Sequence, residues 1–92
     1  MDDTANEFVL LEFHAIWCNP CKAMAPVVEK VVDEVGGVRL VSVDVDDETE
    51  LSTEYNIRSI PSFVLLKDGK VINRLVGATS AERFRDFLSS GK

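Results

Sequence analysis

Cysteine and histidine are scarce in this chain of 92 residues, which contains two cysteines and one histidine. A disulfide scaffold in a small secreted protein uses roughly four to eight cysteines. A structural zinc site needs a full set of Cys and His ligands, usually two pairs. One chain cannot supply either arrangement here. A metal site shared between two chains and a reversible dithiol pair both stay open.

Basic residues are also few, since 10 Lys and Arg face 16 Asp and Glu and give a net charge of -6. This balance argues against binding to nucleic acid and to anionic membrane surfaces, which both favour Lys and Arg. No apolar run approaches the roughly 20 residues of a membrane span. The first residues, MDDTANEF, lack the basic start and apolar core of a signal peptide. The sequence therefore predicts a cytoplasmic protein in a reducing compartment.

Apolar residues make up 46% of the chain and charged residues 28%, the mix of a soluble globular protein. The length suits one domain over residues 1–92 and allows a real core to be buried. We therefore expect a single folded unit.

The first half of the chain has the pattern of a βαβ unit. Residues 8–15 (FVLLEFHA) are almost wholly apolar, with Glu12 as the only charge, which is typical of a strand buried on both faces. Apolar residues then recur at helical spacing until Gly36, where a helix is expected to end. Residues 38–46 alternate like a second strand. A right-handed crossover would make the two strands parallel.

The second half predicts a hairpin between two helices. Residues 47–55 form a short polar helix, and two strand-like segments, 62–67 and 70–77, flank the turn residues Asp68-Gly69. Residues 81–89 form the last helix, capped by the Thr79 or Ser80 side chain. The order is β-α-β-α-β-β-α. We expect an α/β fold with a mixed four-stranded sheet, two parallel strands plus a C-terminal hairpin, flanked by helices.

The two cysteines, Cys18 and Cys21, are separated by two residues. A bridge between them closes so small a loop that it stabilises little. A CxxC pair beside a βαβ pattern instead indicates redox chemistry. Cys18 falls where the strand gives way to the helix, so unpaired N–H groups and the helix dipole favour its reactive thiolate. Cys21, one turn inside, is expected to be more buried and to keep its proton.

Several short segments resemble the thioredoxin family. They occur in the family's order, span nearly the whole chain from Phe8, and comprise EFHA (12–15), WCNPCK (17–22), AP (25–26), IRSIPS (57–62), KDG (67–69) and VGA (76–78). The resemblance implies a thioredoxin-like fold and a thiol-disulfide oxidoreductase that reduces protein disulfides without a cofactor or a metal. Cys18 would attack and Cys21 would resolve the mixed disulfide. It also implies a monomer with a thioredoxin-reductase-type electron donor.

The resemblance further implies a substrate surface around the cysteines. Pro61 would follow a cis peptide bond and leave the backbone of Ile60 free to pair with an extended substrate. The shallow apolar surface would consist of Trp17, Ile60, Val76, Gly77 and Ala78. For Ile60 and Val76 a place in the core is the alternative.

Redox tuning is assigned to Asn19, Pro20 and Pro61 by the same resemblance. Asn19 replaces the glycine that is commonest in the family, and Pro20 suits the first turn of a helix. For Asn19 the alternative is that it is neutral for the redox pair, and for Pro20 the alternative is a purely structural role.

Glu12 matches the place of a buried family acid that exchanges protons with the resolving cysteine. It is one methylene longer than the usual aspartate, and Ser42 stands where a lysine is often found. The alternative is that the longer side chain reaches solvent. His14, beside the site, is interpreted as a packing residue rather than a catalytic or metal-binding one.

The family's first strand and helix have no counterpart before Phe8, which predicts a shortened, four-stranded version. Residues 38–46 would then be an open edge whose charges discourage pairing between sheets.

Two other functional classes stay open. The domain could be a redox-dependent binding module that does not turn over, or an inter-chain metal or iron–sulfur carrier.

Overall fold

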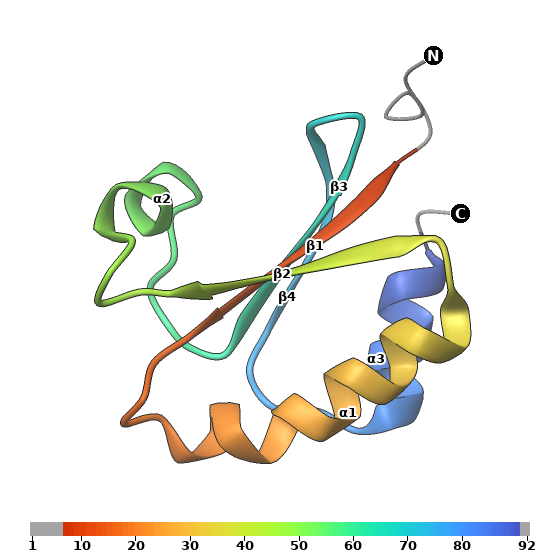
Figure 1. Ribbon diagram of the computed structural model, residues 1–92, viewed down its shortest axis with the longest axis horizontal. Helices are drawn as coiled ribbons and strands as arrows, with labels where there is room; N and C mark the ends of the chain where they lie inside the picture. The colour runs from red at the N-terminus through yellow and green to blue at the C-terminus, as the bar shows by residue number, and fades with distance from the viewer. Residues whose placement is uncertain (1–6, 91–92) are drawn as a thin grey trace.

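The computed structural model describes residues 7–90 and shows four strands and three helices (Figure 1). The elements in chain order are β1 (Phe8–His14), α1 (Asn19–Val35), β2 (Val38–Asp44), α2 (Thr49–Glu54), β3 (Ser62–Lys67), β4 (Lys70–Val76) and α3 (Ala81–Ser89). This is the element order that the sequence predicts.

The four strands form one mixed sheet in the order β2-β1-β3-β4. β1 pairs in parallel with β2, with Glu12 opposite Ser42, and antiparallel with β3. β3 and β4 form an antiparallel hairpin. The predicted parallel pair and hairpin are confirmed, and β2 is an edge strand as expected.

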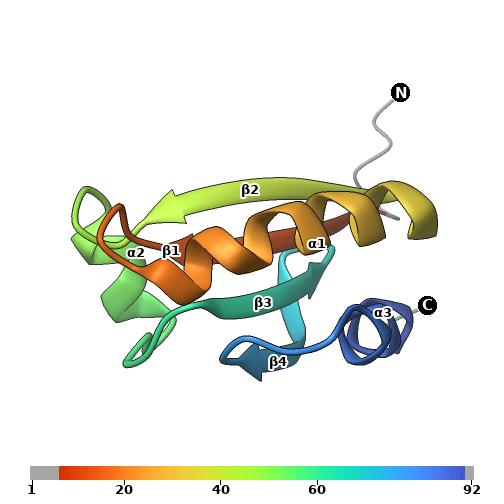
Figure 2. The same cartoon turned by 90° about the horizontal axis from the view of Figure 1, so that it is seen from below.

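Helices cover the two faces of the sheet unequally (Figures 1 and 2). α1 and α3 pack side by side on one face, where Leu10, Val28, Phe63 and Phe84 are fully or almost fully buried. α2 lies at one end of the other face, over a second apolar cluster that includes Phe13. The largely apolar character of β1 follows from this burial on both faces.

The turns use residues that tolerate a positive φ. Asp68 and Gly69 have φ angles of 53° and 82°, which the tight β3–β4 turn requires. Gly36, with φ 72°, ends α1. Ser80 rather than Thr79 caps α3, since its side chain accepts a hydrogen bond from the Arg83 N–H.

β2 ends at Asp44, two residues before the predicted end. The Asp44 carbonyl accepts hydrogen bonds from the N–H groups of Asp47 and Glu48, and its carboxylate accepts one from the Asp46 N–H at 2.9 Å. These bonds turn the chain away from the sheet. Aspartate makes such turns readily because its short side chain reaches the backbone two residues on.

An exposed ion pair joins α1 to α3. Arg85 donates two hydrogen bonds to one carboxylate oxygen of Glu34, at 2.7 and 3.2 Å. The Arg85 hydrogen bond, followed by its charge, lowers the pKa of Glu34 below its ordinary value. The pair therefore contributes stability at neutral pH, and this contribution is lost as the pH falls through the folded-state pKa.

Glu34→Gln is accordingly expected to lower the free energy of unfolding slightly at pH 7 and to leave it unchanged near pH 2. The effect is small because solvent screens both exposed groups. Denaturant unfolding of both proteins at the two pH values checks this. An equal loss at both pH values would show that the ion pair is not the cause.

Candidate active site at the start of α1

Cys18 and Cys21 are joined by a disulfide at the N-terminal end of α1, with their Cα atoms 5.3 Å apart. Cys18 is the N-cap residue of the helix and has an extended backbone. Its Sγ accepts a hydrogen bond from the Cys21 N–H at 3.2 Å. The sulfur of Cys18 therefore occupies the position of a capping acceptor.

This position stabilises negative charge on Cys18 once the disulfide is reduced. The first N–H groups of a helix have no intrahelical acceptor and form the positive end of its dipole. Residues 19–22, the first turn of α1, include no acidic side chain to oppose this effect. The thiolate is the form of cysteine that attacks disulfides.

Both cysteines are only 4% exposed, so the expectation that Cys21 is more buried than Cys18 is wrong for this disulfide state. The two residues form a small cluster with Ala15, against which Val45 and Ile60 pack. In the disulfide each sulfur also covers the other. Cys18 is thus shielded from one side by Cys21 itself.

The loop before β3 lies across from the disulfide. The Ile60–Pro61 peptide bond is cis, as the resemblance implies, and the Pro61 carbonyl accepts a hydrogen bond from the Gly77 N–H at 2.8 Å. Within residues 7–90, neither the N–H nor the C=O of Ile60 has a hydrogen-bond partner. Both groups are available to an extended segment of another protein.

Apolar residues surround the disulfide at the surface. Trp17 is 66% exposed and Val76 is 63% exposed, so Val76 does not belong to the core. Ile60 is half-buried and contacts the cysteine cluster. Ala78 is exposed and Gly77 half-buried. The structure thus places these five residues at or near the surface, whereas Pro61, which the resemblance also assigns to the substrate surface, has a fully buried side chain.

Glu12 lies on β1 among apolar neighbours and is 7% exposed. Its carboxylate accepts a hydrogen bond from the Ser42 hydroxyl at 3.0 Å. Glu12 and Cys21 both line a cavity of about 300 Å³. The other lining residues are His14, Ala15, Ile16, Lys22, Ala25, Glu29 and Ser42. The longer side chain therefore does not extend into solvent, and a shared cavity connects it with Cys21.

Known proteins resemble this chain in sequence and in structure. A family model described as Thioredoxin matches residues 2–90. Thioredoxin of Bacillus subtilis is 38% identical over 88 residues, with 95% of this chain and 85% of the relative covered. The X-ray structure of Fasciola hepatica thioredoxin superimposes with a TM-score of 0.89 at 33% identity, covering 98% of this chain and 86% of that one.

The chain belongs to the thioredoxin family. Relatives differ in length, and the chain spans about half the length of some of them. Mitochondrial thioredoxin of Bos taurus is 40% identical over 81 residues, and this alignment covers 87% of the present chain but only 49% of the relative. The family assignment covers the fold and the CxxC motif of the chain.

Asn19 and Pro20 occupy the first positions of α1 and are both exposed. Both side chains are therefore accessible at the surface of this thioredoxin-family chain. His14 is half-buried and lines the cavity that Glu12 and Cys21 share. No three His, Cys, Asp or Glu side chains group as metal ligands in the described part of the chain. Among residues 7–90, no helix is both long and apolar enough to cross a membrane.

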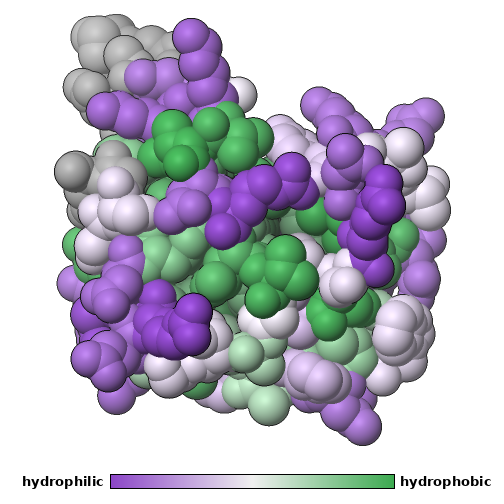
Figure 3. Space-filling view, turned by 180° about the vertical axis from the view of Figure 1, so that it is seen from behind, coloured by the Kyte–Doolittle hydropathy of each residue, from purple (hydrophilic) through white to green (hydrophobic). Residues whose placement is uncertain are grey.

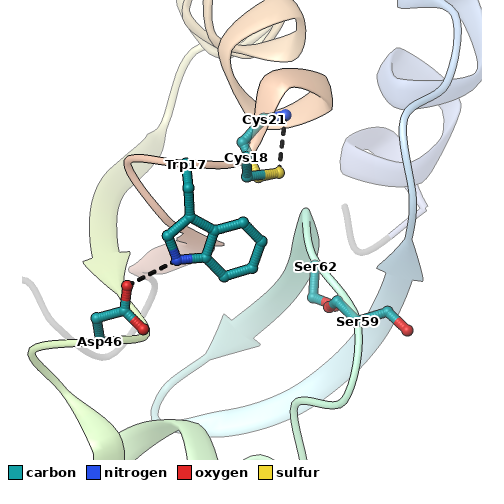
Figure 4. The surroundings of a disulfide bond; sticks show 6 residues. All are labelled: Trp17, Cys18, Cys21, Asp46, Ser59 and Ser62. Atoms are coloured by element: carbon teal, nitrogen blue, oxygen red, sulfur yellow. Dashed lines mark hydrogen bonds between the residues drawn. A yellow bond between two sulfur atoms is a disulfide. The ribbon is translucent and has the colours of Figure 1, made fainter.

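Asp46 is a site residue that sequence reasoning missed, because the acidic run 44–50 reads as a solvated turn. Its carboxylate accepts a hydrogen bond from the Trp17 Nε1–H at 2.9 Å (Figure 4). The two residues are 29 positions apart and meet because β1 and β2 are parallel and end side by side. Ile16, 75% exposed beside Trp17, was also not anticipated.

Asp46→Ala is expected to release the exposed indole and to raise KM for a protein disulfide about two- to fivefold, with little change in kcat. The reason is that an ordered aromatic ring loses less entropy when substrate binds. Steady-state kinetics of Asp46→Ala and of Asp47→Ala, a neighbouring charge change as control, test this. Equal effects of the two substitutions would point to general charge instead of Trp17.

Proposed function

We propose that the protein reduces disulfides of other proteins by dithiol–disulfide exchange at Cys18 and Cys21. One observation carries the proposal. The disulfide lies at a helix N-terminus, where the Cys18 sulfur accepts a backbone N–H, beside an exposed apolar surface and an unpaired backbone segment. This arrangement supplies an activated sulfur and a place for an extended substrate.

The reaction starts from the reduced protein. The Cys18 thiolate attacks one sulfur of the substrate disulfide, a mixed disulfide forms, and the other substrate sulfur leaves as a thiolate that takes up a proton. Cys21 then loses its proton and attacks the Cys18 sulfur, which releases the second substrate thiolate. Two electrons have passed to the substrate. The remaining Cys18–Cys21 disulfide is the form that the structure describes.

Glu12 is proposed to accept the proton that Cys21 gives up. The two residues share one cavity, and Ser42 holds the carboxylate in place by its hydrogen bond. A carboxylate inside the cavity provides a base at a step that otherwise depends on water entering. Glu12 is then a residue of the release step and not of the first attack.

Glu12→Gln is expected to slow resolution of the mixed disulfide roughly 100-fold or more, because general-base catalysis is lost. Alkylation of reduced Cys18 by iodoacetamide should keep its rate. The free energy of unfolding at neutral pH should stay the same or increase, since burying a carboxylate is costly. Single-turnover kinetics and denaturant unfolding measure these quantities.

Ser42→Ala is the matched control, since it removes the hydrogen bond and keeps the carboxylate. It should slow resolution less than Glu12→Gln does. If Glu12→Gln resolves the mixed disulfide as fast as the unmodified protein, water serves as the base for Cys21.

The oligomeric state, the location and the electron donor of the protein are further parts of its function. We propose a monomer in the cytoplasm, with a thioredoxin-reductase-type enzyme as electron donor. The redox pair, the unpaired Ile60 backbone and the apolar surface all come from one chain, which supports a monomer. Arg39 and Asp44 on the open edge strand β2 disfavour pairing with a second sheet.

The two alternatives, a redox-dependent binding module and an inter-chain metal or iron–sulfur carrier, are not favoured by the family assignment. Insulin reduction in excess dithiothreitol separates all three. The proposed enzyme accelerates the reaction at catalytic concentrations and contains no stoichiometric metal. No acceleration over dithiothreitol alone would refute the enzyme, and a visible absorption band with bound metal would support the carrier.

A further inference from the structure

A second cavity, of about 270 Å³, lies between the loop before β3 and the strands β3 and β4. Its residues are Asn56, Ile57, Arg58, Ser59, Ser62, Phe63, Val64, Arg74, Leu75 and Val76. β4 is the edge of the sheet on this side. Figure 3 shows the molecule from behind, where strongly hydrophilic side chains stand beside apolar surface. The cavity combines an apolar floor with two arginines.

Neither arginine forms an ion pair within residues 7–90. The ion pairs among residues 7–90 are Arg39 with Glu7 and Arg85 with Glu34, so Arg58 and Arg74 have no carboxylate partner there. Arg74 donates one hydrogen bond from its guanidinium to the Tyr55 carbonyl, which fixes the side chain at the cavity. A guanidinium has five N–H donors, so most of them remain free for a ligand.

The cavity adjoins the proposed substrate surface. Val76, 63% exposed, belongs to both, and Ser59 precedes Ile60, whose N–H and C=O are unpaired. Arg58 also lines a smaller cavity of about 140 Å³ together with Trp17. An extended segment that pairs with the Ile60 backbone would therefore pass the two arginines within a few residues of the attacked disulfide.

We propose that Arg58 and Arg74 bind the carboxylate of an acidic side chain of the substrate protein, near the disulfide that Cys18 attacks. This inference rests on the proposed function and adds a determinant of substrate choice. Arginine matches a carboxylate in geometry and can bind it through two parallel hydrogen bonds. The methylenes of a glutamate would contact the apolar side chains on the same face of the sheet, Ile57, Val64 and Val76.

Charge complementarity selects this occupant. The chain has a net charge of -6, so the protein as a whole repels acidic segments. Beside the redox site the two unpaired arginines are a local exception to that repulsion. An acidic residue at the right distance from the disulfide is attracted there, and the same residue elsewhere in the substrate is not. The site therefore distinguishes substrates by position as well as by charge.

The test uses synthetic peptides that each contain one disulfide. In one series a single glutamate moves residue by residue along the segment that flanks the disulfide, and in the matched series glutamine replaces it. The ratio of kcat/KM for each Glu peptide to that for its Gln counterpart is measured for the unmodified protein, Arg58→Gln, Arg74→Gln and the double variant. Arg83→Gln, an exposed arginine on α3, is the charge-matched control.

The unmodified protein is expected to prefer the Glu peptide about three- to tenfold at one or two positions. Each single substitution should lower that ratio, the double variant should bring it close to one, and Arg83→Gln should keep it. Equal rates for Glu and Gln at every position, or an equal loss in Arg83→Gln, would overturn this inference alone. If the unmodified protein reduces none of the peptides, the proposed function fails as well.

Discussion

Replacing Cys18 with serine is expected to abolish turnover of protein disulfides to the uncatalysed background, while Cys21→Ser is expected to trap a mixed disulfide with the substrate. The asymmetry follows from the helix. Cys18 is the N-cap residue whose sulfur accepts the Cys21 N–H at 3.2 Å, so its thiolate is stabilised. Cys21 lies inside the first turn and acts only after the mixed disulfide has formed.

The measurement is mass spectrometry of each variant after incubation with oxidised insulin, with separate turnover assays. Cys21→Ser should retain insulin chains bound through Cys18, and dithiothreitol should release them. Cys18→Ser should retain almost none. Equal amounts trapped by both variants would mean that the two cysteines are not distinguished by their places on α1. Asn19→Ser, beside both cysteines, serves as the control that keeps the pair intact.

Phe84→Ala is expected to lower the free energy of unfolding by about 3–5 kcal/mol, the usual cost of removing a fully buried aromatic ring. Phe84 on α3 is 0% exposed, and its ring meets that of Phe63 on β3 edge-to-face, with centroids 4.9 Å apart. The ring centroid of Phe87 lies 5.8 Å from that of Phe84. The substitution removes one of the contacts that attach α3 to the sheet, beside those of Phe87 and Leu88. The total free energy of unfolding of a small domain is roughly 5–15 kcal/mol, so Phe84→Ala removes a large share of it.

Phe84→Leu is the matched control, because it keeps much of the volume and should cost less than about half as much. Urea unfolding followed by the signal of Trp17, the only tryptophan, measures both variants. Equal destabilisation by Ala and Leu would show that ring contacts matter more than the cavity. A loss below about 1 kcal/mol for Phe84→Ala would contradict the close packing of α3.

The sequence predicted the elements of the fold well because their signals are local. The apolar run of β1, the helical spacing before Gly36 and the Asp68-Gly69 turn each depend on neighbours in the chain. The edge position of β2 was also predicted. The end of β2 was placed two residues too late, because the turn depends on hydrogen bonds of Asp44 that alternation along a strand does not reveal.

Features of the site that depend on distant parts of the chain were predicted less well. The CxxC motif identified the redox pair, but its spacing says nothing about how Cys18 is covered by Cys21 and Ile60. The Trp17–Asp46 hydrogen bond joins residues from two strands. The cavity with Arg58 and Arg74 needs the loop before β3 and β4 to meet in space. Composition and periodicity contain no signal for such contacts.

The position of Glu12 in β1 could be predicted from the sequence, but the direction of its side chain could not. A single charge in an apolar strand correctly indicated that Glu12 lies among apolar neighbours. The register of β1 and β2 places Ser42 opposite it. Whether the longer carboxylate turned inward could not be read from the sequence. The structure shows it buried and hydrogen-bonded. Its role as the base for Cys21 stays a prediction that the Glu12→Gln kinetics test.

The central claim is that electrons pass through the Cys18–Cys21 pair to protein disulfides over many cycles. The most direct test couples the protein to NADPH and a thioredoxin reductase, with insulin in large excess, and counts NADPH consumed against insulin thiols released. The account predicts continuous turnover, with two thiols for each NADPH, and none with Cys18→Ser. The account would be contradicted if the reaction stopped once the insulin disulfides reduced equalled the amount of protein present. An equal rate with Cys18→Ser would also contradict it.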